Sequence, residues 1–159
     1  MAKVYLSLGS NIDADQHVAQ ALTELEQAFG ALVQSPIYES EAVGFEGDNF
    51  LNLVVVVDTE LPVGELSTKL RDIENQLGRD RTAPRFSSRT MDIDILLYGD
   101  TVGEIDGVQL PRKEILKNAF VLCPLADVAP DLLHPERKLS YRELWLAYDK
   151  TDQRLWPID

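Results

Sequence analysis

The chain has 159 residues, of which 45% are hydrophobic and 26% charged, and its net charge at pH 7 is −12. This size and composition predict one globular domain spanning residues 1–159, which we expect to be a monomer. The negative charge argues against the broad basic face that nucleic-acid binding requires, and no apolar run approaches the ~20 residues of a membrane span.

In the N-terminal part, apolar side chains recur first at the spacing of a strand and then at the spacing of a helix. Residues 3–8 alternate apolar and polar side chains and predict a strand. No signal-peptide pattern precedes it, so we expect a cytoplasmic protein. From Asp13 to Phe29 apolar side chains recur every three or four residues, which predicts a helix, and Gly30 is placed to end it.

Two strands and a second helix follow. Residues 31–40 predict a strand, and Pro36 indicates a sheet edge because proline cannot donate to a ladder. Residues 50–59 contain four consecutive valines and predict a central strand covered on both faces. Residues 62–77 repeat apolar side chains at helical spacing before Gly78, which predicts a helix that ends there.

A last core strand, residues 91–98, follows a loop over residues 79–90. The resulting order of strand, helix, strand, strand, helix, strand predicts an α+β fold, the ferredoxin-like two-layer sandwich with a βαββαβ core. Beyond this core we expect an added hairpin within residues 99–111, short helical turns around a proline within residues 114–128, and a C-terminal helix that begins at Ser140.

Two carboxylates lie two residues apart on the last core strand. At this spacing Asp92 and Asp94 point the same way, roughly 6.5–7 Å apart at Cα, and can share two metal ions about 3.5–4 Å apart. A solvated strand end with two exposed acids is the alternative. The alternation predicts one core face with Met91, Ile93, Ile95 and Leu97, and an opposite face with Asp92, Asp94, Leu96 and Tyr98.

The segment before these acids is locally cationic. Between positions 69 and 89 six cations stand against three acids, although the whole chain is strongly acidic. Guanidinium groups bind phosphate oxygens in pairs, so cations beside paired carboxylates predict an anionic ligand that carries divalent cations, such as Mg-nucleotide. For each arginine taken alone, a solvated loop charge is the favoured alternative. The six cations are Lys69, Arg71, Arg79, Arg81, Arg85 and Arg89.

Five motifs spread over nearly the whole chain are specific in combination. They are residues 5–11 (Tyr-Leu-Ser-Leu-Gly-Ser-Asn), 50–52 (Phe-Leu-Asn), 77–81 (Leu-Gly-Arg-Asp-Arg), 89–96 (Arg-Thr-Met-Asp-Ile-Asp-Ile-Leu) and 119–122 (Ala-Phe-Val-Leu). With them the chain resembles the 6-hydroxymethyl-7,8-dihydropterin pyrophosphokinase family. The resemblance implies a ferredoxin-like fold and the transfer of a pyrophosphoryl group from ATP to a pterin alcohol in folate biosynthesis, with AMP as the second product.

The resemblance also implies roles for individual residues at the phosphates. Asp92 and Asp94 would hold two Mg²⁺ ions that accompany ATP, and Arg79 and Arg89 would grip the phosphates during transfer. Transfer of this kind relies on positioning and electrostatic stabilisation and needs no covalent enzyme intermediate. The other nucleotide contacts would come from Arg71, Glu74, Arg81, Arg112 and Lys117.

A pterin ring is flat and has an amide-like edge, so it calls for aromatic faces and a side chain that both donates and accepts. Phe50 and Phe120 match the family's stacking pair, for which core packing is the alternative, and Asn52 matches its edge-binding asparagine. A buried amide without partners would cost on the order of 1–3 kcal/mol. The implied substrate contacts are Ser40, Val43, Phe50, Asn52, Phe86 and Phe120.

The chain departs from the family pattern at several positions. Arg112 stands where the family has a histidine, and Asn118 stands where it has an arginine that faces the nucleotide. Phe86 replaces a loop tryptophan, and residues 87–88 are serines in place of a glycine and proline pair. Two alternatives to an active enzyme therefore stay open: a diverged module that binds pterin or nucleotide, and a ferredoxin-like structural domain.

Overall fold

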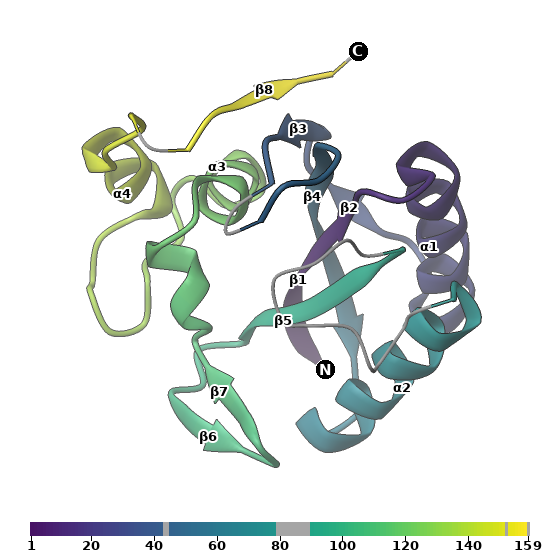
Figure 1. Cartoon of the computed structure of the whole chain (residues 1–159). Coiled ribbons are helices and arrows are strands. Elements are labelled where there is room, and N and C mark those ends of the chain that lie inside the picture. The colour runs from purple at the N-terminus through teal and green to yellow at the C-terminus, as the bar shows by residue number, and fades with distance from the viewer. Residues whose placement is uncertain (43–44, 79–89, 152, 159) are drawn as a thin grey trace.

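The computed structural model describes residues 1–42, 45–78, 90–151 and 153–158 (Figure 1). Its main sheet contains β1 (Ala2–Ser10), β2 (Val33–Gln34), β3 (Tyr38–Ser40), β4 (Phe50–Thr59), β5 (Asp92–Tyr98) and β8 (Leu155–Pro157). The helices are α1 (Ala14–Phe29), α2 (Val63–Gln76), the 3₁₀ turn η1 (Lys113–Leu116), α3 (Ala119–Val128) and α4 (Tyr141–Ala147). A separate hairpin consists of β6 (Gly103–Ile105) and β7 (Val108–Leu110).

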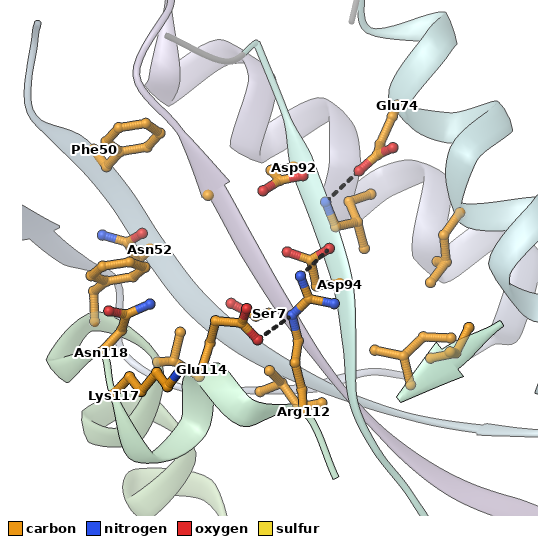
Figure 2. Close-up of a pocket in the computed structure, with 18 of the residues that line it drawn as sticks. Ser7, Phe50, Asn52, Glu74, Asp92, Asp94, Arg112, Glu114, Lys117 and Asn118 are labelled. Atoms are coloured by element: carbon orange, nitrogen blue, oxygen red, sulfur yellow. Dashed lines mark hydrogen bonds and ion pairs between the residues drawn. The ribbon is translucent and has the colours of Figure 1, made fainter. Parts of the chain in front are cut away.

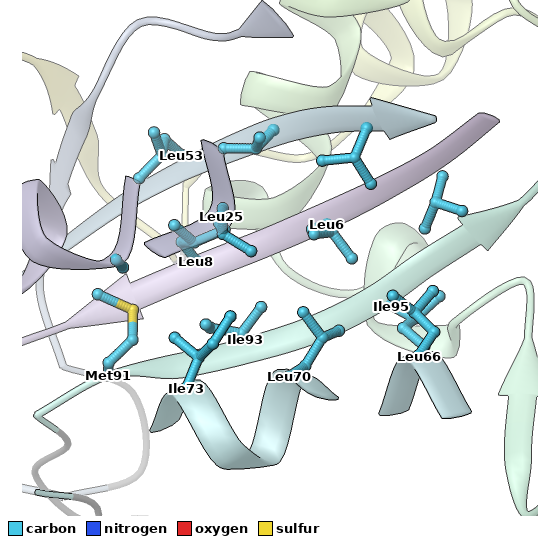
Figure 3. Packing of buried hydrophobic residues seen from close by; sticks show 14 of the residues in the cluster. Leu6, Leu8, Leu25, Leu53, Leu66, Leu70, Ile73, Met91, Ile93 and Ile95 are labelled. Carbon is cyan, nitrogen blue, oxygen red and sulfur yellow. The ribbon is translucent and has the colours of Figure 1, made fainter. Parts of the chain in front are cut away.

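The main sheet is antiparallel and has the order β5-β1-β4-β3-β8, with β2 also paired to β4. The crossovers through α1 and α2 place these two helices on one face, which confirms the predicted ferredoxin-like core (Figure 1). Figure 3 shows the resulting packing, in which leucines and isoleucines of α2 meet those of β1 and β5. The buried core residues there include Leu6, Leu8, Leu66, Leu70, Ile73, Ile93 and Ile95.

The second face of the sheet is also covered. Val54 and Val56 of β4 and Leu96 of β5 pack there against α3, η1 and α4, in a second buried cluster that includes Leu122 and Tyr141. The prediction that residues 50–59 form a central strand covered on both faces is therefore confirmed. The described helices include none that is both long and apolar enough to cross a membrane.

The predicted strand over residues 31–40 is divided at Pro36 into β2 and β3. Within the described residues β2 pairs with β4 alone, as expected for an edge, whereas β3 is not at the sheet edge, because β8 pairs outside it with Ser40 opposite Leu155. The edge prediction is wrong for β3 for a simple reason: β8 has only three residues and includes Pro157, so it has no strand pattern of its own. Its position depends on pairing with β3 and is visible only in the tertiary structure.

A β-bulge changes the predicted faces of β5. Tyr5 of β1 lies opposite Leu97 while Leu6 lies opposite Ile95, so Leu96 is the extra residue. Leu97 consequently packs in the second cluster with Leu96, and Tyr98 packs against the α1–α2 side. The predicted alternation is wrong for these last two residues and holds before the bulge, where the two aspartates lie opposite the core.

The segments after β5 follow the predictions with one correction. The hairpin is confirmed, with Asp106 and Gly107 at φ 52° and 82° in its turn. Pro124 lies inside α3 and does not limit this region to short turns, because burial along most of the helix outweighs the missing backbone donor. Ser140 caps α4 in a capping box with Glu143, as expected.

Candidate active site

An open cavity of about 660 Å³ lies where β1, β4 and β5 meet α2, η1 and α3. This volume is within the usual ~300–1,000 Å³ of small-molecule sites. Ten predicted site residues line it: Ser40, Phe50, Asn52, Arg71, Glu74, Asp92, Asp94, Arg112, Lys117 and Phe120. The other five, Val43, Arg79, Arg81, Phe86 and Arg89, lie outside the described residues, as do the serines at 87–88.

Small residues on β1 make room for the acidic centre of the cavity. In the antiparallel register Asp92 lies opposite Gly9 and Asp94 lies opposite Ser7, and all four line the cavity. Figure 2 shows Ser7, Asp92 and Asp94 there. Directly opposite residues have neighbouring Cβ positions, so larger side chains at Ser7 or Gly9 would fill the space above the carboxylates. Ser7 and Gly9 belong to the 5–11 motif, although the sequence alone did not identify them as site residues.

The environment of the acidic centre changes the pKa of Asp94. Burial, then the nearby Asp92 carboxylate and more weakly Glu74, raise the pKa of Asp94 to about 7, while the Arg112 guanidinium opposes the shift. About 30% of the Asp94 side chain is still exposed, so a ligand in the cavity can reach it. A cation placed beside this carboxylate would relieve the repulsion between the acids.

Arg112 lies beside the acidic centre. Its Nη2 lies 3.6 Å from Asp94 Oδ1, and its Nε lies 3.0 Å from Glu114 Oε2 (Figure 2). Its backbone N–H donates to the Leu96 carbonyl at 3.0 Å, which attaches the start of η1 to β5. Arg112, which we predicted to replace a histidine of the family, therefore lies beside Asp94, and Glu114 is a cavity residue for which the sequence held no signal.

Glu74 has a structural contact that the sequence did not reveal. Its side chain is 3% exposed, and Oε2 accepts a 2.7 Å hydrogen bond from the backbone N–H of Ile93. Ile93 lies between the two aspartates, so this bond attaches α2 to the part of β5 that bears them. Glu74 thus lines the cavity and also positions the strand that carries the acids.

The described residues contain no group of three or more His, Cys, Asp and Glu side chains arranged to hold a metal ion. Mg²⁺ rarely needs such a cage, because one or two carboxylates usually suffice when phosphates and water complete its octahedral shell. The oxygen donors of Asp92 and Asp94 fit this type of site, in which the metal ion arrives with its phosphate ligand.

The opposite end of the cavity combines aromatic rings with a fixed amide. Asn52 is 3% exposed, and its Nδ2 donates a 2.7 Å hydrogen bond to Ser40 Oγ, which supplies the partner that a buried amide requires. The Phe50 ring stands edge-on to Phe45, with centroids 6.2 Å apart. A Cβ on Gly9 would lie 3.3 Å from Asn52 Oδ1, so glycine leaves room for the amide. Phe45 lines the cavity and is absent from the predicted set.

The chain matches the family model described as 7,8-dihydro-6-hydroxymethylpterin-pyrophosphokinase over residues 5–130. Two bacterial relatives bear the name 2-amino-4-hydroxy-6-hydroxymethyldihydropteridine pyrophosphokinase. The one from Aquifex aeolicus is 38% identical over 145 residues, which are 90% of each chain. The one from Bacillus subtilis is 39% identical over 156 residues, covering 96% of this chain and 89% of the relative.

Solved structures with the same fold include bifunctional proteins. A wild-type Plasmodium falciparum HPPK-DHPS crystal structure has a TM-score of 0.73 and 18% identity, over 93% of this chain and 44% of the other. A second HPPK-DHPS structure, in complex with substrates, has a TM-score of 0.72 and 16% identity, over 92% and 43%. The chain thus spans less than half of these longer proteins, and the likeness supports the fold.

The family model covers most of the chain, and the bacterial relatives match it nearly from end to end. The chain therefore belongs to the 7,8-dihydro-6-hydroxymethylpterin-pyrophosphokinase family.

Proposed function

We propose that the chain transfers the terminal pyrophosphoryl group of ATP to the hydroxyl of 6-hydroxymethyl-7,8-dihydropterin, a step of folate biosynthesis. The observation that carries the proposal is one cavity with an aromatic, amide-bearing end and a paired-carboxylate centre beside a guanidinium group. Family membership and the names of the bacterial relatives support the same reaction.

The pterin would occupy the aromatic end. Phe50 and Phe120 line the cavity and would contact the flat faces of the ring. Asn52 would face the amide-like edge, in an orientation held by its bond to Ser40. Holding a substrate in one orientation contributes to catalysis because it removes rotational freedom before the reaction. In the sequence-based prediction Val43 and Phe86 complete this end.

ATP would place its phosphates at the acidic centre. Asp92 and Asp94 would hold Mg²⁺ together with phosphate oxygens, which would neutralise charge on the transferred group. The raised pKa of Asp94 supports this assignment, because burial and the nearby Asp92 carboxylate disfavour the charged form, which a bound cation would stabilise. The number of ions, two by resemblance to the family, stays a prediction.

The cations at the cavity would orient the triphosphate. Arg112, Lys117 and Arg71 line it, and the predicted set adds Arg79, Arg81 and Arg89 from the cationic segment. In the reaction the pterin hydroxyl oxygen forms a bond to the β-phosphorus and releases its proton. The bond from the β-phosphorus to the oxygen that bridges it to the α-phosphorus breaks, and AMP leaves with that oxygen.

Phosphorus NMR tests this proposal directly. The protein is mixed with ATP, Mg²⁺ and 6-hydroxymethyl-7,8-dihydropterin, and we expect AMP and the pterin diphosphate to appear in equal amounts. Accumulation of ADP, or ATP consumption that does not depend on the pterin, would contradict the proposal. Calorimetric binding of both substrates without product would instead identify a diverged binding module. Monomeric state and cytoplasmic localisation stay predictions.

A further inference from the structure

The last described segment, residues 153–158, contacts two walls of the cavity that come from separate parts of the chain. On one side β8 pairs with β3, and Arg154 Nη1 lies 3.3 Å from Oε1 of the cavity residue Glu41. On the other side Gln153 bonds to the segment that precedes and begins α3. Figure 1 shows this segment passing from α4 along α3 to β3.

Gln153 makes three hydrogen bonds to consecutive residues of the second wall. Its Oε1 accepts from the Ala119 backbone N–H at 2.8 Å, and its Nε2 donates to the Lys117 carbonyl at 3.0 Å. The same Nε2 approaches Asn118 Oδ1 at 3.4 Å. Lys117, Asn118 and Phe120 all line the cavity, so one side chain holds the backbone turn from which three lining residues project.

The bond to Asn118 has a chemical consequence. An amide has its acceptor and its donors on opposite sides of one planar group. Because Oδ1 of Asn118 is turned to Gln153, its Nδ2 is turned the other way, and Figure 2 shows this nitrogen on the side of Ser7 and Glu114. A ligand at this wall would therefore meet N–H donors, which suit phosphate or carbonyl oxygens, although the family's arginine is missing here.

We propose that Gln153 is a positioning residue for the transfer reaction: it orients the Asn118 amide and fixes the wall formed by residues 117–120. The inference rests on the proposed function, because it takes this cavity as the place where ATP and pterin meet. Tyr148 Oη reinforces the same wall by donating to the Lys117 carbonyl at 2.6 Å. The C-terminal segment thus contributes to substrate geometry without itself reaching the acidic centre.

Two substitutions test whether Gln153 orients the Asn118 amide or only attaches the C-terminal segment to the cavity wall. Gln153→Ala removes all three bonds. Gln153→Glu keeps an acceptor for the Ala119 N–H but loses the donor, and its carboxylate repels Asn118 Oδ1, which favours rotation of the amide so that oxygen faces the ligand. We expect both to lower kcat/KM on the order of tenfold, as for a misplaced substrate contact. The matched control is Gln27→Ala on the exposed face of α1, which should leave kcat/KM unchanged.

The Asn118→Ala variant makes the test specific. If Gln153 acts through Asn118, both substitutions at Gln153 lose most of their effect on kcat/KM in the Asn118→Ala background. The inference is overturned if the Gln153 substitutions lower kcat/KM by the same factor in the Asn118→Ala background. It is also overturned if they leave kcat/KM at the wild-type value in the original background. Melting temperatures measured alongside identify any variant that merely unfolds.

Two further measurements distinguish failure of this inference from failure of the proposed function. In ¹⁵N-labelled protein the side-chain amide signals of Gln153 should shift on Asn118→Ala, and unchanged signals overturn the proposed contact. Affinity for the α,β-methylene analogue of ATP, measured by calorimetry, should fall in Gln153→Glu. If the wild-type chain forms no AMP, the proposed function is contradicted. If the wild type is active and the Gln153 variants have the same kcat/KM, only the role of Gln153 is contradicted.

Discussion

The Glu74 carboxylate accepts a 2.7 Å hydrogen bond from the backbone N–H of Ile93, the residue between the two cavity aspartates. The bond connects α2 to β5 within the buried part of the molecule, where water does not replace a lost partner. It also places a third carboxyl group near Asp94 and contributes to the raised pKa of that residue. Glu74 therefore affects both the stability of the fold and the charge of the site.

Removing this carboxylate should destabilise the protein. Glu74→Ala leaves the Ile93 N–H without its acceptor, and we expect a loss of about 1–3 kcal/mol in the free energy of unfolding. Glu74→Gln retains an oxygen acceptor and should lose less. Urea denaturation monitored by circular dichroism measures both, with Glu26→Ala on the exposed face of α1 as the control. Equal stability of Glu74→Ala and the control would refute the structural role of the bond.

Asp94 should make the metal-free protein less stable as the pH rises. Burial raises its pKa from 3.8 to about 7, so the folded state prefers the protonated form. The sign follows from linkage: its contribution to stability is greatest below about pH 4 and is lost as the pH rises to about 7. Asp94→Asn should therefore be more stable than the wild type at pH 8 without divalent ions, on the order of 1–3 kcal/mol.

The same substitution should abolish pyrophosphoryl transfer, because it removes a proposed metal ligand.

Thermal unfolding in the presence of a chelator, from pH 4 to pH 8, measures the stability difference between Asp94→Asn and the wild type. If that difference does not grow with pH, the charge repulsion inferred at the cavity centre is wrong. Added Mg²⁺ with the α,β-methylene analogue of ATP should stabilise the wild type and have little effect on the variant.

Ser40 should matter for pterin affinity through Asn52. Ser40→Ala removes the acceptor of the 2.7 Å bond from Asn52 Nδ2, so the buried amide loses its fixed orientation. We expect pterin affinity to fall about tenfold, equivalent to a lost hydrogen bond of about 1.4 kcal/mol, with little change for Mg-ATP. Calorimetry with each ligand checks this. The matched control is Ser67→Ala, a serine that lines the cavity from α2, and equal pterin affinities of the two variants would contradict the role of Ser40.

His134 should give the C-terminal region the opposite pH dependence. Its ring is 2% exposed, and Nδ1 accepts the backbone N–H groups of Glu136 and Arg137 at 3.1 Å each. Burial lowers the pKa of His134 from its ordinary value of 6.5, so the folded state prefers the neutral ring. Its contribution to stability is present above about pH 6.5 and is lost as the pH falls through the lowered pKa.

The His134→Asn variant tests this behaviour, because the amide oxygen can still accept a hydrogen bond but does not titrate in this range. We expect the wild type to lose stability relative to this variant between pH 7 and pH 5, as measured by urea denaturation. Parallel pH profiles of the two proteins would show that His134 does not contribute. Performing the test in the Asp94→Asn background removes the opposing contribution of Asp94.

The order of the core elements and the position of the paired acids could be predicted from the amino-acid sequence alone. Helix spacing up to Gly30, strand alternation before the bulge and the valine-rich run of β4 are local signals, each supported by the side chains of one segment. The short motifs identified the family, and ten predicted site residues from distant parts of the chain meet in one cavity.

Features that depend on a partner distant in sequence could not be predicted and are seen in the folded structure. The bulge at Leu96 appears in the pairing of β5 with β1, the strand β8 depends on β3, and Gln153 reaches residues more than thirty positions earlier. Nor does any sequence pattern join Glu74 to Ile93. The physical reason is that a hydrogen bond or ladder between remote segments requires no periodicity in either one, so such contacts arise only when the packed core brings the segments together.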